Sequence, residues 1–428
     1  MRAEPFVCYR PTPERARDFA SLPYDVFDRT SAASYVADHP TSFLAIDRPE
    51  TSFPPDHDMY APEVYAKAAE LLRDRVADGT LLRDGTPCYY LYRLRQEGRE
   101  QVGIVTACAL DDYTSGVIRR HELTHPEKEL DRVRHIEATG CQTGPIYLAY
   151  RDDPTLGTLV SAAMGASPLY DFVDEQDVRE TIWRIARPAA VEAFRMMLSY
   201  VPCAYIADGH HRAASAARVC QEMRAARDGS PTDDACDYLL CVLFPASQLT
   251  IRPYHRVVRD AGGLSEDGLV SALGGAGFCV GARQDAPVMP SRPGRFGMHA
   301  FGAWRKLTSG DGTSDPVGSL DVSVLQDRIL SPILGIDDPR RDPRMSFVGG
   351  MVSADDVAAR AGTDGIAFTL YPTSMREVMS VADAGLLMPP KSTWFEPKLS
   401  SGLFIRRIGR AGSMPDIMAA DPRRVSGE

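Results

Sequence analysis

The segment that most constrains the fold is a short apolar run followed by a polar turn and an alanine-rich stretch. Residues 203–207 (Cys-Ala-Tyr-Ile-Ala) predict a short buried strand. Residues 212–226 contain strong helix formers and no Gly or Pro, which predicts a helix. The connection between strand and helix consists of Asp208, Gly209, His210 and His211, with Arg212 at the start of the helical segment.

A strand that turns sharply into a helix is typical of a site for phosphate or another anion. The first N–H groups of the helix have no partner within it, and the helix dipole is positive at that end. Gly209 has no Cβ and lets a ligand approach the backbone, while the guanidinium of Arg212 can contact two phosphate oxygens. Asp208 is a candidate metal ligand or proton acceptor. In the structural alternative, Asp208 caps the helix and forms a salt bridge with Arg212.

Other polar segments accompany this turn along the chain. In order, they are residues 22–26 (Leu-Pro-Tyr-Asp-Val), 120–122 (Arg-His-Glu) with Thr124, Lys128, Asp131 and Arg132, residues 207–212, residues 255–258 (His-Arg-Val-Val), residues 388–395 and residues 397–403. With these segments the chain resembles the DUF1015 family of bacterial and archaeal proteins over nearly its whole length. The Asp-Gly-His-His-Arg stretch also resembles, more distantly, the phosphate-binding turn of the ParB/sulfiredoxin superfamily, which includes free serine kinases.

The expected fold class is α+β, and the resemblance implies a mixed-sheet, ParB/sulfiredoxin-like core with insertions. A chain of 428 residues exceeds what one hydrophobic core usually serves. Gly and Pro become frequent after Asp260, where short strand-like pieces alternate with amphipathic segments at 322–334 and 375–384. We therefore predict a phosphate-binding domain over residues 1–258 and a smaller C-terminal α+β domain over residues 259–428.

Composition and charge limit the classes of partner. The net charge of −10, with no run of Lys and Arg, argues against a nucleic-acid partner. No signal peptide is apparent and no apolar run is long enough to cross a bilayer, so we expect a cytoplasmic protein without a membrane partner. The nine cysteines include no Cys-x-x-Cys pair. The oligomeric state stays open.

Residues 121–125 contain a literal His-Glu-x-x-His, the zinc-peptidase signature. That chemistry needs both histidines on one face of a helix, with the glutamate as general base. Pro126 follows His125 directly and biases it away from helical dihedral angles. We therefore expect the helix to begin at Pro126, which disfavours a zinc peptidase.

Further candidates come from the segments that resemble the family. Arg120, His121, Lys128 and Arg132 are candidates for binding the anion, and Glu122 is a candidate base or metal ligand. The candidates for contacting the substrate are Tyr24, Asp25, His255, Arg256, Lys391, Ser392, Thr393 and Lys398. For each of them, an ordinary packed or solvated side chain is the alternative.

The predicted function is phosphoryl transfer from a nucleotide, ATP or ADP, to a small hydroxylated metabolite, with free L-serine suggested by the resemblance. Gly209, His210, His211 and Arg212 would hold the phosphates of the donor. Asp208 and Glu122 would bind Mg²⁺ (or Mn²⁺) or deprotonate the acceptor. Two alternatives remain open: a phosphatase for a small phosphoester that uses His210 or His211, and a nucleotide-binding module without turnover. No Walker-type loop is present, so binding of the donor depends on the Asp208 turn.

Overall fold

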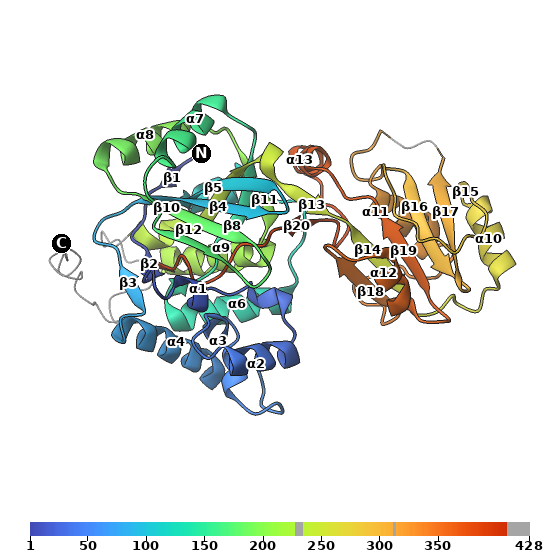
Figure 1. Cartoon of the computed structure of the whole chain (residues 1–428), viewed down its shortest axis with the longest axis horizontal. Helices are drawn as coiled ribbons and strands as arrows, with labels where there is room; N and C mark the ends of the chain where they lie inside the picture. The colour runs from blue at the N-terminus through green and yellow to red at the C-terminus, as the bar shows by residue number, and fades with distance from the viewer. Residues whose placement is uncertain (227–233, 311–313, 409–428) are drawn as a thin grey trace. The chain divides into compact units, whose positions relative to one another are not determined.

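The computed structural model describes residues 1–226, 234–310 and 314–408, which form two compact units (Figure 1). The first unit contains residues 1–119, 124–248 and the segment from residue 397 onward. The second unit contains residues 120–123 and 249–396. The chain therefore enters the second unit twice and returns to the first unit near its end.

The predicted boundary after residue 258 differs from the division between these units. It falls at the end of β14 (Tyr254–Val258), which lies in the second unit. This strand pairs with β18 (Met345–Gly349) and β19 (Ile366–Leu370), and its hydrogen bonds place it in the sheet of that unit. The return of residues 397–408 to the first unit was not expected from the sequence.

A nine-stranded mixed sheet forms the centre of the first unit. In spatial order its strands are β6 (Ile118–Arg119), β11 (Ala204–Asp208), β8 (Ile146–Tyr150), β12 (Tyr238–Pro245), β5 (Arg99–Ala109), β4 (Tyr89–Gln96), β10 (Arg179–Ile185) and β9 (Tyr170–Val173), with β1 (Ala3–Glu4) paired to β5. β11 runs parallel to β6 and antiparallel to β8, while β8 and β12 are parallel. The mixed α+β architecture predicted from the sequence is confirmed.

The helices described in the first unit are α1 (Ala16–Phe19), α2 (Arg29–Asp38), α3 (Leu44–Asp47), α4 (Pro62–Ala77), α5 (Leu110–Thr114), α6 (Pro126–Thr139), α7 (Pro154–Ala163), α8 (Pro188–Ser199) and α9 (His210–Ala225). Those from α5 onward share a hydrophobic core with alternate residues of this sheet, whereas α1, α3 and α4 contribute to a separate buried cluster. Leu148 of β8 and Ile206 of β11 belong to the same buried cluster as Val133 of α6 and Ala213 of α9. Two short pairs complete the unit: β2 (Tyr9–Pro11) with β3 (Leu81–Arg83), and β7 (Cys141–Gln142) with β21 (Arg406–Arg407).

The second unit is built on a six-stranded antiparallel sheet. Its order is β15 (Phe278–Val280), β17 (Ala303–Ser309), β16 (Arg295–Ala300), β19, β14 and β18, and β13 (Thr250–Arg252) pairs separately with β20 (Trp394–Glu396). The helices are α10 (Glu266–Gly275), α11 (Asp321–Leu325), α12 (Ala354–Ala361) and α13 (Met375–Asp383), and α11 continues into the π-helical turn η5 (Gln326–Leu330). Leu273, Phe296 and Phe368 are among the residues that fill its core.

The elements predicted around Asp208 and in the C-terminal region are present, with one informative difference. The amphipathic segment 322–334 is α-helical only to Leu325 before the hydrogen bonding changes in η5. Pro253, which has no N–H to contribute to a ladder, separates β13 from β14. Among the described residues, no helix has both the length and the apolar character needed to span a membrane.

Candidate functional site

The turn after β11 places Arg212 against two glycines. Gly209 is the N-cap residue of α9 and has φ +87°, in the left-handed region. A Cβ at Gly209 would lie 3.1 Å from Nε of Arg212, and a Cβ at Gly144 would lie 3.3 Å from its Cδ. The space beside Gly209, which the sequence suggested for a ligand, is therefore filled by the Arg212 side chain.

Asp208 binds two cationic side chains. Its Oδ2 lies 3.0 Å from Nη2 of Arg212, and its Oδ1 lies 3.1 Å from Nζ of Lys398. Burial would raise the pKa of Asp208, but Lys398 and Arg212 outweigh this effect and hold the pKa well below its usual value. Gly209 rather than Asp208 is the N-cap, so only the salt bridge of the structural alternative is present. Asp208 is therefore a charged group with both oxygens in use.

The guanidinium of Arg212 is held by two hydrogen bonds, and one of its three nitrogens has no partner within the described residues. Nη1 donates to the carbonyl of Pro145 at 2.7 Å, and Nη2 donates to Asp208. Nε is buried and has no hydrogen-bond partner within the part of the chain that the structure describes. A buried donor without a partner is costly, which marks this atom as one that a ligand or a water molecule would satisfy.

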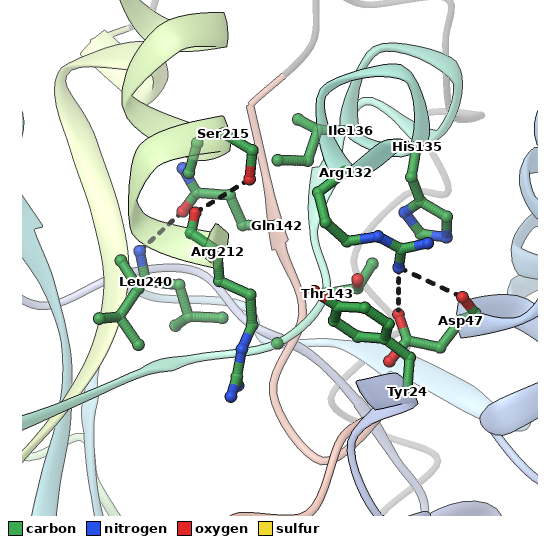
Figure 2. Close-up of a pocket in the computed structure, with 13 residues that line it drawn as sticks. Tyr24, Asp47, Arg132, His135, Ile136, Gln142, Thr143, Arg212, Ser215 and Leu240 are labelled. Carbon is green, nitrogen blue, oxygen red and sulfur yellow. Dashed lines mark hydrogen bonds and ion pairs between the residues drawn. The ribbon is translucent and has the colours of Figure 1, made fainter. Parts of the chain in front are cut away.

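Arg212 lines a pocket in the first unit, with a cavity of about 30 Å³. Figure 2 shows Arg132, Tyr24 and Asp47 grouped on one side of it and Arg212 on the other. The guanidinium of Arg132 lies over the ring of Tyr24, with Cζ 4.1 Å from the ring centre. The cavity has room for a water molecule or a small polar group.

Arg132 is neutralised by acidic residues. Its guanidinium lies 2.8 Å from Asp131 and 3.4 Å from Asp47, and it also donates to the carbonyl of Asp47. The hydroxyl of Tyr65 donates to Asp131 at 2.9 Å. Arg132 therefore positions Tyr24 and α3, and it has less charge to offer an anion than Arg212.

His135 is a pocket residue that the sequence interpretation missed. It is buried, and its Nε2–H donates to the carbonyl of Ile46 at 2.9 Å, so Nδ1 is the unprotonated nitrogen of the neutral ring. Burial and the nearby Arg132 lower the pKa of His135, which keeps the ring neutral. The spacing of three residues from Arg132 on the predicted helix was a usable signal. Asp47, from the distant α3, had no comparable signal.

The two histidines of the turn have different surroundings. His211 accepts a hydrogen bond at Nε2 from the backbone N–H of His125, at 2.9 Å. This bond joins the first turn of α9 to the N-cap of α6. His210 is buried. His211 thus has a structural task in addition to any role in binding.

The helix that follows the His-Glu-x-x-His sequence begins at Pro126, as predicted. His125 has φ −90° and ψ 122°, which is extended backbone, and His121 also lies outside a helix. The two histidines therefore do not share a helical face, as the zinc-peptidase signature requires. On α6, Lys128 is exposed whereas Arg132 is buried, so the two residues that were expected to face one anion differ in environment.

The second unit contains the other sequence-predicted candidates, Arg120, His121, Glu122, His255, Arg256, Lys391, Ser392 and Thr393. The carbonyl of His121 accepts from the N–H of Met388, and its Nε2 lies 3.4 Å from Oγ1 of Thr393. The hydroxyl of Ser392 donates to Pro389, and Lys391 lies over the ring of Tyr254.

Arg256 and His255 are both deeply buried in the second unit. Arg256 donates to the carbonyls of Pro390 and Lys391, and burial lowers its pKa to about 10 despite Tyr254 and Glu122. His255 accepts at Nδ1 from the N–H of Leu370, and burial with the neighbouring Arg256 lowers its pKa to about 4. The contacts of Arg256 with Pro390 and Lys391 hold the loop before β20 in place.

Of the substrate candidates, Tyr24, Asp25 and Lys398 belong to the first unit, where Tyr24 is half-buried and Asp25 exposed.

Comparisons with known proteins give structural likenesses of low identity. A conserved hypothetical protein from Pyrococcus furiosus is 14% identical, with 71% of this chain and 95% of that chain covered and a TM-score of 0.36. A free serine kinase variant in complex with ADP is 16% identical (70% and 92% covered, TM-score 0.35). A C-terminally truncated SbnI from Staphylococcus aureus is 12% identical (71% and 87% covered, TM-score 0.35). No curated protein matches the chain.

The family of the chain is identified from its sequence. The family described as "Protein of unknown function (DUF1015)" matches residues 3–323. This range includes the Asp208 turn, both arginines of the pocket, and the Arg-His-Glu and His-Arg-Val-Val segments on which the resemblance rested. The chain belongs to the DUF1015 family.

Proposed function

We propose that this protein is a small-molecule phosphotransferase. It would bind a nucleotide, ATP or ADP, at the Asp208 turn and transfer a phosphoryl group to a hydroxylated metabolite, with free L-serine as the candidate acceptor. The observation that carries the proposal is the Arg212 side chain, which is fixed in a pocket wall with a buried, unused Nε–H. The acceptor rests on the resemblance of the turn to those of free serine kinases.

The surroundings of Arg212 suit a phosphate group. Its guanidinium is oriented by Asp208 and the Pro145 carbonyl before any ligand arrives, so binding requires little reorganisation. It lies at the N-terminal end of α9, where the helix dipole favours an anion. Lys398 adds a second cation at the same carboxylate. Phosphoryl transfer depends mostly on such positioning and charge neutralisation.

His135 is the proton acceptor that we propose in the first unit. Asp208 is less suited to this task because Arg212 and Lys398 occupy its oxygens and lower its pKa. His135 lines the same pocket as Arg212, is neutral, and has Nδ1 as its acceptor atom. Mg²⁺ bound to the nucleotide would supply further charge neutralisation. Glu122, in the second unit, is the other carboxylate that the sequence predicted as a base or metal ligand.

The second candidate function is nucleotide binding without turnover. The ion pairs of Asp208 with Arg212 and Lys398 favour this function, because a turn whose only carboxylate is occupied by cations can hold phosphate without promoting a reaction. Arg212 would then serve the same binding role, and His135 would have no effect beyond stability.

The test is to incubate the purified protein with ATP or ADP, Mg²⁺ and a panel of hydroxylated metabolites headed by L-serine. Nucleotide affinity, free phosphate and phosphorylated product are measured together. Transfer to an acceptor that is lost in His135→Gln supports the proposal, and saturable binding without product supports the module. Release of phosphate from phosphoserine without nucleotide would indicate a phosphatase.

A matched pair of variants on α9 locates the binding site. Arg212→Ala removes a charge-assisted contact and should weaken nucleotide binding about tenfold or more. Arg218→Ala removes an exposed arginine of the same helix that pairs with Glu222, and it should bind nucleotide as the wild type does. Equal affinity in both variants would place the phosphate site elsewhere.

A further inference from the structure

The second unit contains a pocket of about 370 Å³ that none of the predicted site residues lines. Its walls come from the turn before β16, the ends of β16 and β17, and the α11–η5 segment. This volume lies within the range of about 300–1,000 Å³ that is usual for small-molecule sites. The pocket is therefore large enough to enclose a small metabolite.

Three arginines surround this pocket: Arg292, Arg295 and Arg328. Other arginines of the unit pair with carboxylates, as Arg283 and Arg305 do with Glu266. Among the residues that the structure describes, none of the three pocket arginines forms an ion pair, and the only hydrogen bond of their guanidinium groups joins Nη1 of Arg295 to Thr308. Three unneutralised guanidinium groups that line one pocket favour an anion.

Asp321 contributes a carboxylate to the same pocket. Its Oδ1 accepts from the backbone N–H of Gly294 at 2.8 Å, which fixes the turn before β16. Its Oδ2 is buried and has no hydrogen-bond partner within the described residues. Burial raises the pKa of Asp321 to about 6, against the opposing hydrogen bond from Gly294 and with a contribution from Glu377.

The backbone around these side chains is tightly arranged. Gly294 has φ +74°, and a Cβ there would lie 3.2 Å from Oγ of Ser309. The carbonyl of Gly294 accepts from the N–H of Ser309 at 3.1 Å. Nη1 of Arg328 lies 4.0 Å from the Cβ position of Gly277, whose carbonyl accepts from Gly310. The pocket walls are thus held by hydrogen bonds, and the arginine charges are not needed to stabilise them.

We propose that this pocket binds a small phosphorylated metabolite, with its phosphate at the three arginines and a hydroxyl or amino group at Oδ2 of Asp321. A phosphate monoester has up to two negative charges and three acceptor oxygens, which suits several guanidinium groups better than a single carboxylate does. The unpartnered Oδ2 calls for a hydrogen-bond donor, and the dianionic phosphate group of a monoester has none to offer. The three arginines and the unpartnered Oδ2 together suit a metabolite that combines a phosphate group with a hydroxyl or amino donor. This site is independent of the Asp208 turn.

The experiment is calorimetric titration of the full-length protein with glucose 6-phosphate, inorganic phosphate and uncharged glucose at constant ionic strength. It is performed in an Arg212→Ala background, which weakens the proposed nucleotide site. We expect saturable binding of glucose 6-phosphate, weaker binding of inorganic phosphate and none of glucose.

Three variants then test the assignment of roles. Arg328→Gln should weaken glucose 6-phosphate binding about tenfold or more, because a charge-assisted contact is lost. Asp321→Asn keeps Oδ1 for Gly294 but places an amide donor at Oδ2, so it should weaken glucose 6-phosphate and spare inorganic phosphate. Arg360→Gln, on the exposed surface of α12, is the matched control and should bind as the parent does.

Two outcomes would overturn the proposal. One is that neither glucose 6-phosphate nor inorganic phosphate binds saturably in the millimolar range. The other is binding that Arg328→Gln and Arg360→Gln leave equally unaffected. Should Arg328→Gln fail to fold, as judged by its thermal midpoint, the exposed Arg292→Gln replaces it with the same expected direction.

Discussion

Nζ of Lys398 lies 3.1 Å from Oδ1 of Asp208, although 190 residues separate them in sequence. The contact joins the segment that returns to the first unit with the turn that follows β11. On its other oxygen, the same carboxylate holds Arg212. Asp208 therefore binds two cationic side chains, Arg212 and Lys398, that are far apart from each other in the sequence.

Asp208→Asn should lower stability and nucleotide affinity together. The amide cannot balance Lys398 and Arg212, and leaving a buried charge without its partner costs about 3 kcal/mol. Chemical denaturation gives the free energy of unfolding, and titration gives the nucleotide affinity of the folded fraction. A variant that keeps wild-type stability but loses turnover would contradict this and restore Asp208 as the general base.

Gly209→Ala should destabilise the protein and disturb Arg212. An alanine at φ +87° is strained by about 1–2 kcal/mol, and its Cβ would press on the guanidinium at 3.1–3.3 Å. The control is Gly157→Ala in α7, where the added methyl has open space and helix propensity favours alanine by about 1 kcal/mol. The thermal midpoint of unfolding should fall in Gly209→Ala and rise in Gly157→Ala. A neutral Gly209→Ala variant would show that the left-handed turn is not required.

Glu180 should make stability depend on pH. It is fully buried in the first unit, where Tyr92 donates to Oε2 at 2.7 Å and Ser400 donates to Oε1. Burial raises its pKa from 4.5 to about 7, in spite of the hydrogen bonds from Ser400 and Tyr92 that lower it.

Because the folded state binds this proton more tightly than the unfolded state does, the contribution of Glu180 to stability is greatest below pH 4.5. The contribution of Glu180 is lost as the pH rises to about 7, and the loss amounts to about 3 kcal/mol. Glu180→Gln removes the titration, so the unfolding free energy of the wild type minus that of the variant should fall across this window. Parallel curves for the two proteins would refute the assignment.

The metal requirement should be that of a nucleotide-binding protein, with Mg²⁺ or Mn²⁺ rather than zinc. We expect chelation of Mg²⁺ to weaken nucleotide binding, and elemental analysis to find no stoichiometric zinc. The physical reason is that His125 is extended and the following helix starts at Pro126, so the zinc-peptidase geometry is not formed. One tightly bound zinc, lost in the double variant His121→Ala, His125→Ala, would overturn this expectation.

Local chemistry made several features predictable from the sequence. The apolar run before Asp208 and the alanine-rich stretch after it form β11 and α9, because strand and helix preferences act over a few residues. The start of α6 at Pro126 follows from the restriction that proline places on the residue before it. The salt bridge between Asp208 and Arg212 joins residues only four apart in the sequence and was among the alternatives.

The partners of these residues were decided by the tertiary structure. Lys398 at Asp208, Gly144 beside Arg212, and Asp47 at Arg132 are brought from segments 68 to 190 residues away by the order of the strands and by the return of the chain. Propensity and periodicity describe only neighbours along the chain, so they revealed which side chains carry charge but not which charges meet. Consequently the sequence indicated an anion site at the turn after β11, and the fold determined that both oxygens of Asp208 are occupied by cations whereas Nε of Arg212 has no partner within the described residues.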